Sequence, residues 1–136
     1  MNKHALIVLL TTACLAACSN TANKDEFNSN QVRQERFLVT NKKLPASFAD
    51  IQQSLFKHRD ACQIYFEFRP DPQQVHYATL VYRQNQEDDL RESVFADLTA
   101  YASGNVQMDV YAYYAHNHDL AYALLRALSE PEHCPR

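Results

Sequence analysis

Glycine is nearly missing from this chain, and tryptophan is missing entirely. Gly104 is the one glycine among 136 residues. Loops that cradle phosphate and turns that present a nucleophilic serine need glycine, because their backbone takes positive φ or approaches the ligand closely. The composition therefore excludes phosphate-binding loops and hydrolase-type nucleophile turns. Because no other catalytic spacing is present, we expect a protein that is not an enzyme and holds no cofactor.

Neither sign of charge dominates the sequence. It has 13 Lys and Arg against 16 Asp and Glu, which gives a formal net charge of −3 at pH 7. A nucleic-acid partner needs a strongly basic face, so we expect no nucleic-acid binding. The spacings C-x-x-C and H-E-x-x-H, which mark many redox and zinc sites, are also absent.

The N-terminal segment is built like a secretory signal peptide. Lys3 gives it a positive start, an apolar run follows over 5–10, and the small residues Ala16 and Ala17 stand before Cys18. The run is shorter than the roughly 20 apolar residues that cross a bilayer. We therefore predict an export signal rather than a transmembrane helix.

The four residues Leu15, Ala16, Ala17 and Cys18 resemble the lipobox of bacterial lipoproteins, in which an aliphatic residue and two small residues precede the cysteine. The resemblance implies cleavage before Cys18, a diacylglyceryl group on its thiol and a fatty acid such as palmitate on its amine. Two or more acyl chains anchor a protein stably in a membrane, whereas one binds only marginally. Ser19 stands where an Asp commonly retains Gram-negative lipoproteins in the inner membrane, so the resemblance implies the periplasmic face of the outer membrane.

These features divide the chain into three parts. Residues 1–17 are the predicted signal peptide. Residues 18–35 are predicted to be the lipidated Cys18 and a flexible tether, because this stretch has too few large apolar side chains to order itself. Residues 36–136 form the predicted single domain, whose length is ordinary for a small domain.

The sequence pattern of the domain predicts an α+β fold. Alternating apolar residues predict strands, and apolar residues spaced three or four apart predict helices. The predicted elements are a strand over 36–40, a turn over 41–43, a helix over 46–59, strands over 63–69 and 75–83, a helix from the cap Asn85 to Gly104, a strand over 106–115 and a helix from the cap Asn117 to Ser129. The first six follow the ferredoxin-like βαββαβ order, which has a four-stranded antiparallel sheet. We expect the extra C-terminal helix to cover the second face of that sheet.

Cys62 and Cys134 are the pair that remains once the signal peptide is removed and Cys18 is lipidated. In an oxidising compartment such a pair favours a structural disulfide. The alternative is a zinc site, because His58 lies one helical turn before Cys62 and His133 adjoins Cys134. Adjacent ligands fit one tetrahedral ion poorly, so we favour the disulfide.

Two histidines near the last predicted helix are the candidate metal ligands. In an extended segment His116 and His118 point the same way, close enough to share a metal, and Asp119 offers an oxygen. The competing interpretation is a polar turn from strand to helix with Asn117 as the cap. Metal binding through His116 and His118 is therefore the alternative function.

Tyrosine is frequent, with 8 residues in the chain. Tyr111 and Tyr113 share the more polar face of the last predicted strand, which the ferredoxin-like order puts at an edge of the sheet. Exposed tyrosine is enriched at protein interfaces, and an edge strand can recruit a partner's strand. The competing interpretation is that both rings pack beneath the last helix. We expect a non-catalytic lipoprotein that binds another envelope protein through Tyr111 and Tyr113, as an accessory or assembly factor.

Overall fold

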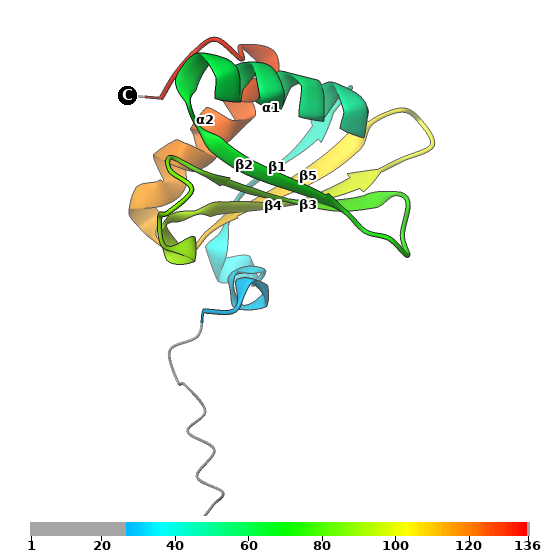
Figure 1. The fold of residues 1–136 in the computed structure, drawn as a ribbon. Coiled ribbons are helices and arrows are strands. Elements are labelled where there is room, and N and C mark those ends of the chain that lie inside the picture. The colour runs from blue at the N-terminus through cyan, green and yellow to red at the C-terminus, as the bar shows by residue number, and fades with distance from the viewer. Residues whose placement is uncertain (1–26, 136) are drawn as a thin grey trace, which may run out of the picture.

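The computed structural model describes residues 27–135, which fold into one antiparallel sheet and two helices (Figure 1). The predicted signal peptide and Cys18 lie outside the described residues. The strands and helices, in chain order, are β1 (Leu38–Leu44), α1 (Phe48–Cys62), β2 (Tyr65–Pro70), β3 (Tyr77–Arg83), β4 (Val94–Ala100), β5 (Val106–Ala112) and α2 (His118–Ser129). Between residues 27 and 135, neither helix is long and apolar enough to cross a membrane.

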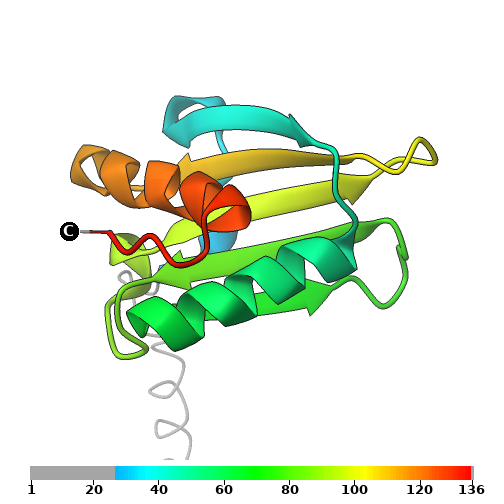
Figure 2. The ribbon, with the colours of Figure 1, turned by 90° about the horizontal axis from the view of Figure 1, so that it is seen from above.

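The sheet has the order β1-β5-β4-β3-β2, and every neighbouring pair is antiparallel. Strands β2 to β5 therefore form a meander of successive hairpins. The first strand, β1, pairs with β5, so the connection through α1 crosses the sheet from one edge to the other. Both helices lie on the same face of the sheet, as the view from above shows (Figure 2). We call this the helix face and the opposite one the open face.

Local sequence signals explain why α1 begins and ends where it does. The side chain of Ser47 accepts a hydrogen bond from the backbone N–H of Asp50, and the Asp50 carboxylate accepts one from the backbone of Ser47. This reciprocal capping box satisfies N–H groups that have no partner within the helix. The Ser47 hydroxyl and backbone N–H also lower the pKa of the Asp50 carboxyl. At the other end Gln63 takes the left-handed conformation that stops the helix.

The core lies between the helix face and the two helices. Along β3 and β5 every second residue is buried, and the residues between are half-buried. This alternation gives each strand one face toward the helices. The buried core is formed mainly by these residues: Ile51, Leu55, Ile64, Ala78, Leu80, Tyr82, Val94, Ala96, Leu98, Val106, Met108, Val110, Ala112, Leu120, Ala121 and Leu124.

The helix predicted between Asn85 and Gly104 is wrong. Residues 90–92 form the short 3₁₀ helix η3 (Leu90–Glu92), and the strand β4 follows. Val94 and Leu98 are four residues apart, so they fit one face of a helix and equally one face of a strand. Gly104 does take a positive φ of 78°, but it does so in the hairpin turn between β4 and β5.

The ferredoxin-like arrangement is accordingly not present, because the sheet has five strands instead of four. The C-terminal helix also does not cover the second face, since α2 packs beside α1 on the helix face. The turn predicted over 41–43 is wrong as well, because those residues pair with β5 as part of β1. The polar Asn41, Lys42 and Lys43 are tolerated in a strand because β1 is an exposed edge.

Residues 27–37 pack on the open face, although the composition predicts a flexible tether up to residue 35. They form two short 3₁₀ helices, η1 (Ser29–Val32) and η2 (Glu35–Phe37). Val32 is fully buried, which compensates for the polar composition of its neighbours. We call residues 27–37 the N-terminal segment.

Candidate functional site

The open face divides into a covered part and an uncovered part. The N-terminal segment contacts β4, through Phe27 against Phe95 and Arg33 against Asp97. The residues of β2 and β3 that point to the same side are half-buried or exposed. We call six of them the β2–β3 patch: Tyr65, Glu67, Arg69, Thr79, Val81 and Arg83. Their strand register sets them side by side, with Tyr65 opposite Arg83 and Glu67 opposite Val81.

The long side chains of the β2–β3 patch already have partners within it. Arg69 pairs with the carboxylate of Glu67 at 2.6 Å. The guanidinium of Arg83 lies 4.6 Å from the centre of the Tyr65 ring, and its Nη1 donates to the carbonyl of Asp88 at 3.0 Å. Side chains that are held before binding lose less conformational entropy when a partner arrives. The patch is thus a surface with aromatic, aliphatic and paired charged groups.

An ion pair attaches the N-terminal segment to the sheet. Nε of Arg33 donates to both carboxylate oxygens of Asp97, at 2.8 and 3.0 Å, and Nη1 donates to the carbonyl of Ser29. Only 20% of the Arg33 side chain and 15% of the Asp97 side chain are exposed. Burial and the Asp97 carboxylate raise the pKa of the neighbouring Tyr77 hydroxyl. The segment is therefore fixed by a desolvated charge pair rather than by loose contact.

Aromatic rings extend this attachment. Phe27 packs edge-on against Tyr113 at 5.5 Å, and Phe37 stacks on the same ring at 5.1 Å. Tyr113 also contacts Tyr114 at 4.9 Å, and these distances are favourable for aromatic pairs. Tyr113 thus connects the end of β5 to the N-terminal segment.

The two tyrosines predicted as an interface are placed differently from each other. Tyr111 is in β5, which lies between β1 and β4, and Tyr113 follows the end of β5, so neither residue is on an edge strand. Tyr113 already has several aromatic partners within the chain, and Tyr111 is half-buried on the open face opposite Phe95. Burial, followed by the charges of Asp109 and Asp97, raises the pKa of the Tyr111 hydroxyl. An interface role stays a prediction for both Tyr111 and Tyr113, and Tyr113 also attaches the N-terminal segment.

A cleft of about 930 Å³ lies beside α2, bounded by the loop after β3 and by the C-terminal tail. His116 lies at its rim, with Nε2 2.7 Å from a carboxylate oxygen of Glu92. Asn117 is buried and donates to the same carboxylate at 3.2 Å. The cleft thus holds one histidine that has an acidic neighbour.

The geometry assumed for a metal site at His116 and His118 is not present. The segment is not extended, because His116 lies in the 3₁₀ helix η4 (Ala115–Asn117) and His118 begins α2. The argument that both imidazoles point the same way therefore fails. Across residues 27–135, no group of three or more His, Cys, Asp or Glu is arranged to hold a metal ion.

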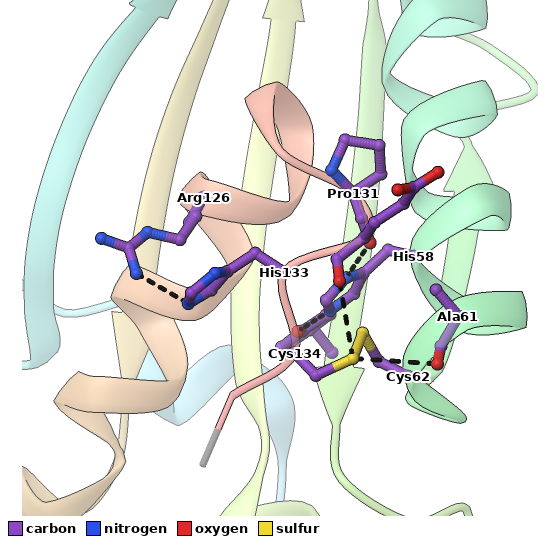
Figure 3. Close-up of a disulfide and its surroundings, with 9 residues drawn as sticks. His58, Ala61, Cys62, Arg126, Pro131, His133 and Cys134 are labelled. Atoms are coloured by element: carbon purple, nitrogen blue, oxygen red, sulfur yellow. Dashed lines mark hydrogen bonds between the residues drawn. A yellow bond between two sulfur atoms is a disulfide. The ribbon is translucent and has the colours of Figure 1, made fainter.

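The sulfurs of Cys62 and Cys134 lie at disulfide distance, 2.00 Å, as the sequence predicts (Figure 3). The bond joins the end of α1 to the tail that follows α2. His58 and His133 do not join the two cysteines as zinc ligands, because both imidazoles have other partners. His58 contacts the carbonyl of Pro131 and the hydroxyl of Tyr82, while His133 lies 2.9 Å from Nη1 of Arg126.

Sequence reasoning did not identify the β2–β3 patch as a candidate surface. The alternation of β2 was visible, with Tyr65, Glu67 and Arg69 on one side. The sequence prediction misses the patch because it puts the last helix on that face.

No protein-family model matches this chain, and no curated protein sequence matches it either.

Proposed function

We propose that this chain is a lipid-anchored protein of the Gram-negative envelope, whose domain binds another envelope protein through the β2–β3 patch. The anchor part rests on the sequence, because Leu15, Ala16, Ala17 and Cys18 resemble a lipobox. The binding part rests on one structural observation. Both helices cover one face of the sheet, and the N-terminal segment covers only part of the other, which leaves the patch without a covering layer among the described residues.

The chemistry of the patch favours a protein as the partner. Tyr65, Thr79 and Val81 offer aromatic, hydroxyl and aliphatic contact area, and the charged side chains around them are already paired. Such a mixture is typical of interfaces between proteins that also exist apart.

The position of the N-terminal segment supports the same function. If Cys18 is acylated, only residues 19–26 connect the lipid to Phe27, which contacts the open face. A stretch of this length reaches about 30 Å at most when fully extended. The anchor then restricts how far the patch can move from the outer membrane, and it favours a partner that lies at the membrane surface.

The anchor is tested with Cys18→Ser in cells that are fed a labelled fatty acid. We expect the wild-type chain to carry the label and to fractionate with the outer membrane, and the variant to lose both properties. Ser19→Asp, which the lipoprotein resemblance predicts to retain the protein in the inner membrane, is the matched control. A labelled Cys18→Ser chain would contradict the assigned lipidation site.

The binding surface is mapped with a photoreactive residue placed at Thr79 in the patch, or at Tyr122 on the exposed side of α2. We expect position 79 of the full chain to crosslink one dominant envelope protein in cells, and position 122 not to capture that protein. Equal capture from both positions, or no capture from position 79, would contradict the proposal.

Metal binding through His116 and His118 is the second candidate function. Its one favourable contact is the 2.7 Å pair of His116 with Glu92, which puts a nitrogen and an oxygen donor together. Calorimetric titration of the full chain with Zn²⁺ and Cu²⁺ tests it. Heat that disappears in His116→Ala and persists in His133→Ala would support metal binding, and unchanged heat in His116→Ala would remove this candidate.

A further inference from the structure

The two edges of the sheet differ in how they are protected from pairing. On β1 the register shifts between Leu38 and Thr40, which marks a β-bulge or irregularity, and Lys42 and Lys43 are exposed. Bulges and lysines are the devices by which proteins prevent an edge strand from recruiting another strand. On β2 the register is regular from Tyr65 to Pro70, no lysine is present, the charges of Glu67 and Arg69 pair with each other, and the one proline stands at the end of the strand. The second edge is therefore the one that remains open to pairing.

The alternation of hydrogen-bonded pairs between β2 and β3 shows which backbone groups of β2 point away from β3. The N–H of Asp71 donates to the carbonyl of Tyr77 at 2.9 Å, in continuation of the register that joins β2 to β3. Hydrogen-bonded and non-bonded pairs alternate along an antiparallel ladder. Glu67 therefore directs its backbone groups toward β3, and Phe66 and Phe68 direct theirs outward. Two N–H and two C=O groups at the centre of this edge thus point away from the sheet.

An exposed aromatic side chain lies directly above this edge. Phe56 of α1 is 46% exposed, although its ring packs edge-on against Phe66 at 5.1 Å. The guanidinium of Arg59 lies 4.9 Å from the centre of the Phe56 ring. A large apolar ring beside unpaired strand groups is the combination that a second strand with its own aromatic side chains would bury.

We propose that two copies of this chain pair through β2, antiparallel, with the two-fold axis at Phe66, to form one continuous sheet. The outward groups of Phe66 then bond to Phe66 of the second copy. On the open face, Tyr65 lies opposite Glu67 of the second copy, and its hydroxyl can donate to that carboxylate. On the helix face, the Phe56 and Phe66 rings of both copies meet at the axis. A two-fold interface requires such a self-complementary strand.

The neighbouring registers are less favourable, which is why the axis lies at Phe66. An axis at Glu67 would set that carboxylate directly opposite its own copy, and like charges in this position are destabilising. An axis at Phe68 would pair Phe66 with Pro70, which has no N–H to donate. An axis at Tyr65 would require Cys62 to pair as a strand residue, although it belongs to α1.

This inference does not depend on the proposed function. The pairing uses the backbone of β2, the helix-face rings and the contact of Tyr65 with Glu67 of the second copy, while Thr79, Val81 and Arg83 of the β2–β3 patch stay accessible. Failure of one proposal therefore leaves the other standing, because partner capture and self-association are measured separately.

The register is tested by cysteine crosslinking of the full chain in cells, with single substitutions Tyr65→Cys, Phe66→Cys and Glu67→Cys. Directly opposed residues in a hydrogen-bonded pair have Cα atoms about 5.5 Å apart, within the reach of a disulfide. We expect Phe66→Cys to give the strongest dimer band on a non-reducing gel. Dominant crosslinking through Glu67→Cys would contradict the proposed axis, and the absence of a dimer from all three would contradict the pairing.

A second measurement keeps the test valid if Phe66→Cys fails to fold. The full chain is extracted in mild detergent, and its mass is followed by sedimentation as it is diluted. Phe56→Glu adds a charge at the axis, and we expect it to raise the dimer dissociation constant at least about tenfold. Tyr122→Glu, at the similarly exposed Tyr122 on α2, is the matched control and should leave the constant unchanged. A wild-type chain that stays monomeric at every concentration overturns the proposal.

Discussion

The imidazole of His58 and the hydroxyl of Tyr82 are joined by a hydrogen bond of 2.8 Å inside the core. The other ring nitrogen, Nδ1, lies 2.7 Å from the carbonyl of Pro131, which can only accept, so Nδ1 carries the proton. In the neutral ring Nε2 is then the acceptor of the Tyr82 O–H. One histidine thereby links α1, the middle of the sheet and the C-terminal tail.

The hydrogen bond between His58 and Tyr82 predicts that substitutions of these two residues have coupled effects on the free energy of unfolding. Tyr82→Phe leaves Nε2 of His58 without its donor, and we expect the free energy of unfolding to fall by about 1–2 kcal/mol. His58→Leu removes the other partner. In a double-mutant cycle followed by urea unfolding, the two changes should show a coupling of about 1 kcal/mol. Strictly additive effects would mean that the 2.8 Å bond does not contribute to stability.

The same tyrosine predicts a loss of stability at alkaline pH. Burial raises the pKa of the Tyr82 hydroxyl above its ordinary value of 10.0. Above that value the unfolded chain loses the proton while the folded chain keeps it. The contribution of Tyr82 is therefore complete below about pH 10 and is lost as the pH rises further. Unfolding midpoints between about pH 9 and 11 should fall less steeply for Tyr82→Phe than for the wild-type chain. Identical slopes would contradict this assignment.

The disulfide predicts that removing it lowers the free energy of unfolding strongly. Cys62 and Cys134 are 72 residues apart in sequence, so the bond closes a long loop in the unfolded chain. By the chain-entropy argument, Cys62→Ala with Cys134→Ala should lower the free energy of unfolding by about 4 kcal/mol. Denaturant unfolding of the double variant and of the oxidised wild-type chain measures the difference. An unchanged midpoint would mean that the disulfide does not contribute to stability.

The ion pair between Arg33 and Asp97 predicts how firmly the N-terminal segment is attached. Asp97→Asn removes the charge that holds Arg33, and we expect trypsin to cleave after Arg33 and Arg36 roughly ten times faster. Asp109→Asn is the matched control, because Asp109 lies opposite Asp97 in the register without contacting Arg33 by a hydrogen bond or ion pair among the described residues. Equal cleavage rates in wild type and Asp97→Asn would contradict a stabilising role for the pair.

The sequence predicts α1 and α2 well because their signals are local. Ser47 and Asp50 mark the start of α1, and a stripe of leucines from Leu120 onward defines the inner side of α2. The strands predicted over 75–83 and 106–115 correspond to β3 and β5, which are shorter by two and three residues, and their regular alternation is what identifies them. The general class, α+β with an antiparallel sheet, follows from these elements alone.

The part between Asn85 and Gly104 could not be predicted in the same way. β4 is central, so Val94, Phe95 and Ala96 are all buried, and the alternation that identifies a half-exposed strand is lost. Its apolar residues then match a helical spacing by coincidence. Because this segment fits a helix, the sequence predicts one strand too few and puts α2 on the wrong face of the sheet.

The packing of the N-terminal segment on the open face could not be predicted from the sequence, for a related reason. Val32 and Arg33 lie in a polar stretch that has no periodic pattern, and they are ordered only by contacts with distant residues such as Asp97. Composition describes the average of such a stretch and says nothing about one buried valine or one charge pair. Tertiary contacts therefore decide where the folded domain begins.

We propose that the β2–β3 patch of the chain binds an envelope protein, and a single substitution that abolishes this binding is the sharpest test. The full chain would be produced in cells as wild type, as Val81→Arg in the patch and as Tyr122→Arg on α2. The envelope protein that position 79 crosslinks would then be quantified after crosslinking and membrane extraction. The account predicts that Val81→Arg reduces its recovery at least about tenfold while Tyr122→Arg leaves it unchanged. Unchanged recovery with a folded, membrane-bound Val81→Arg chain would contradict it.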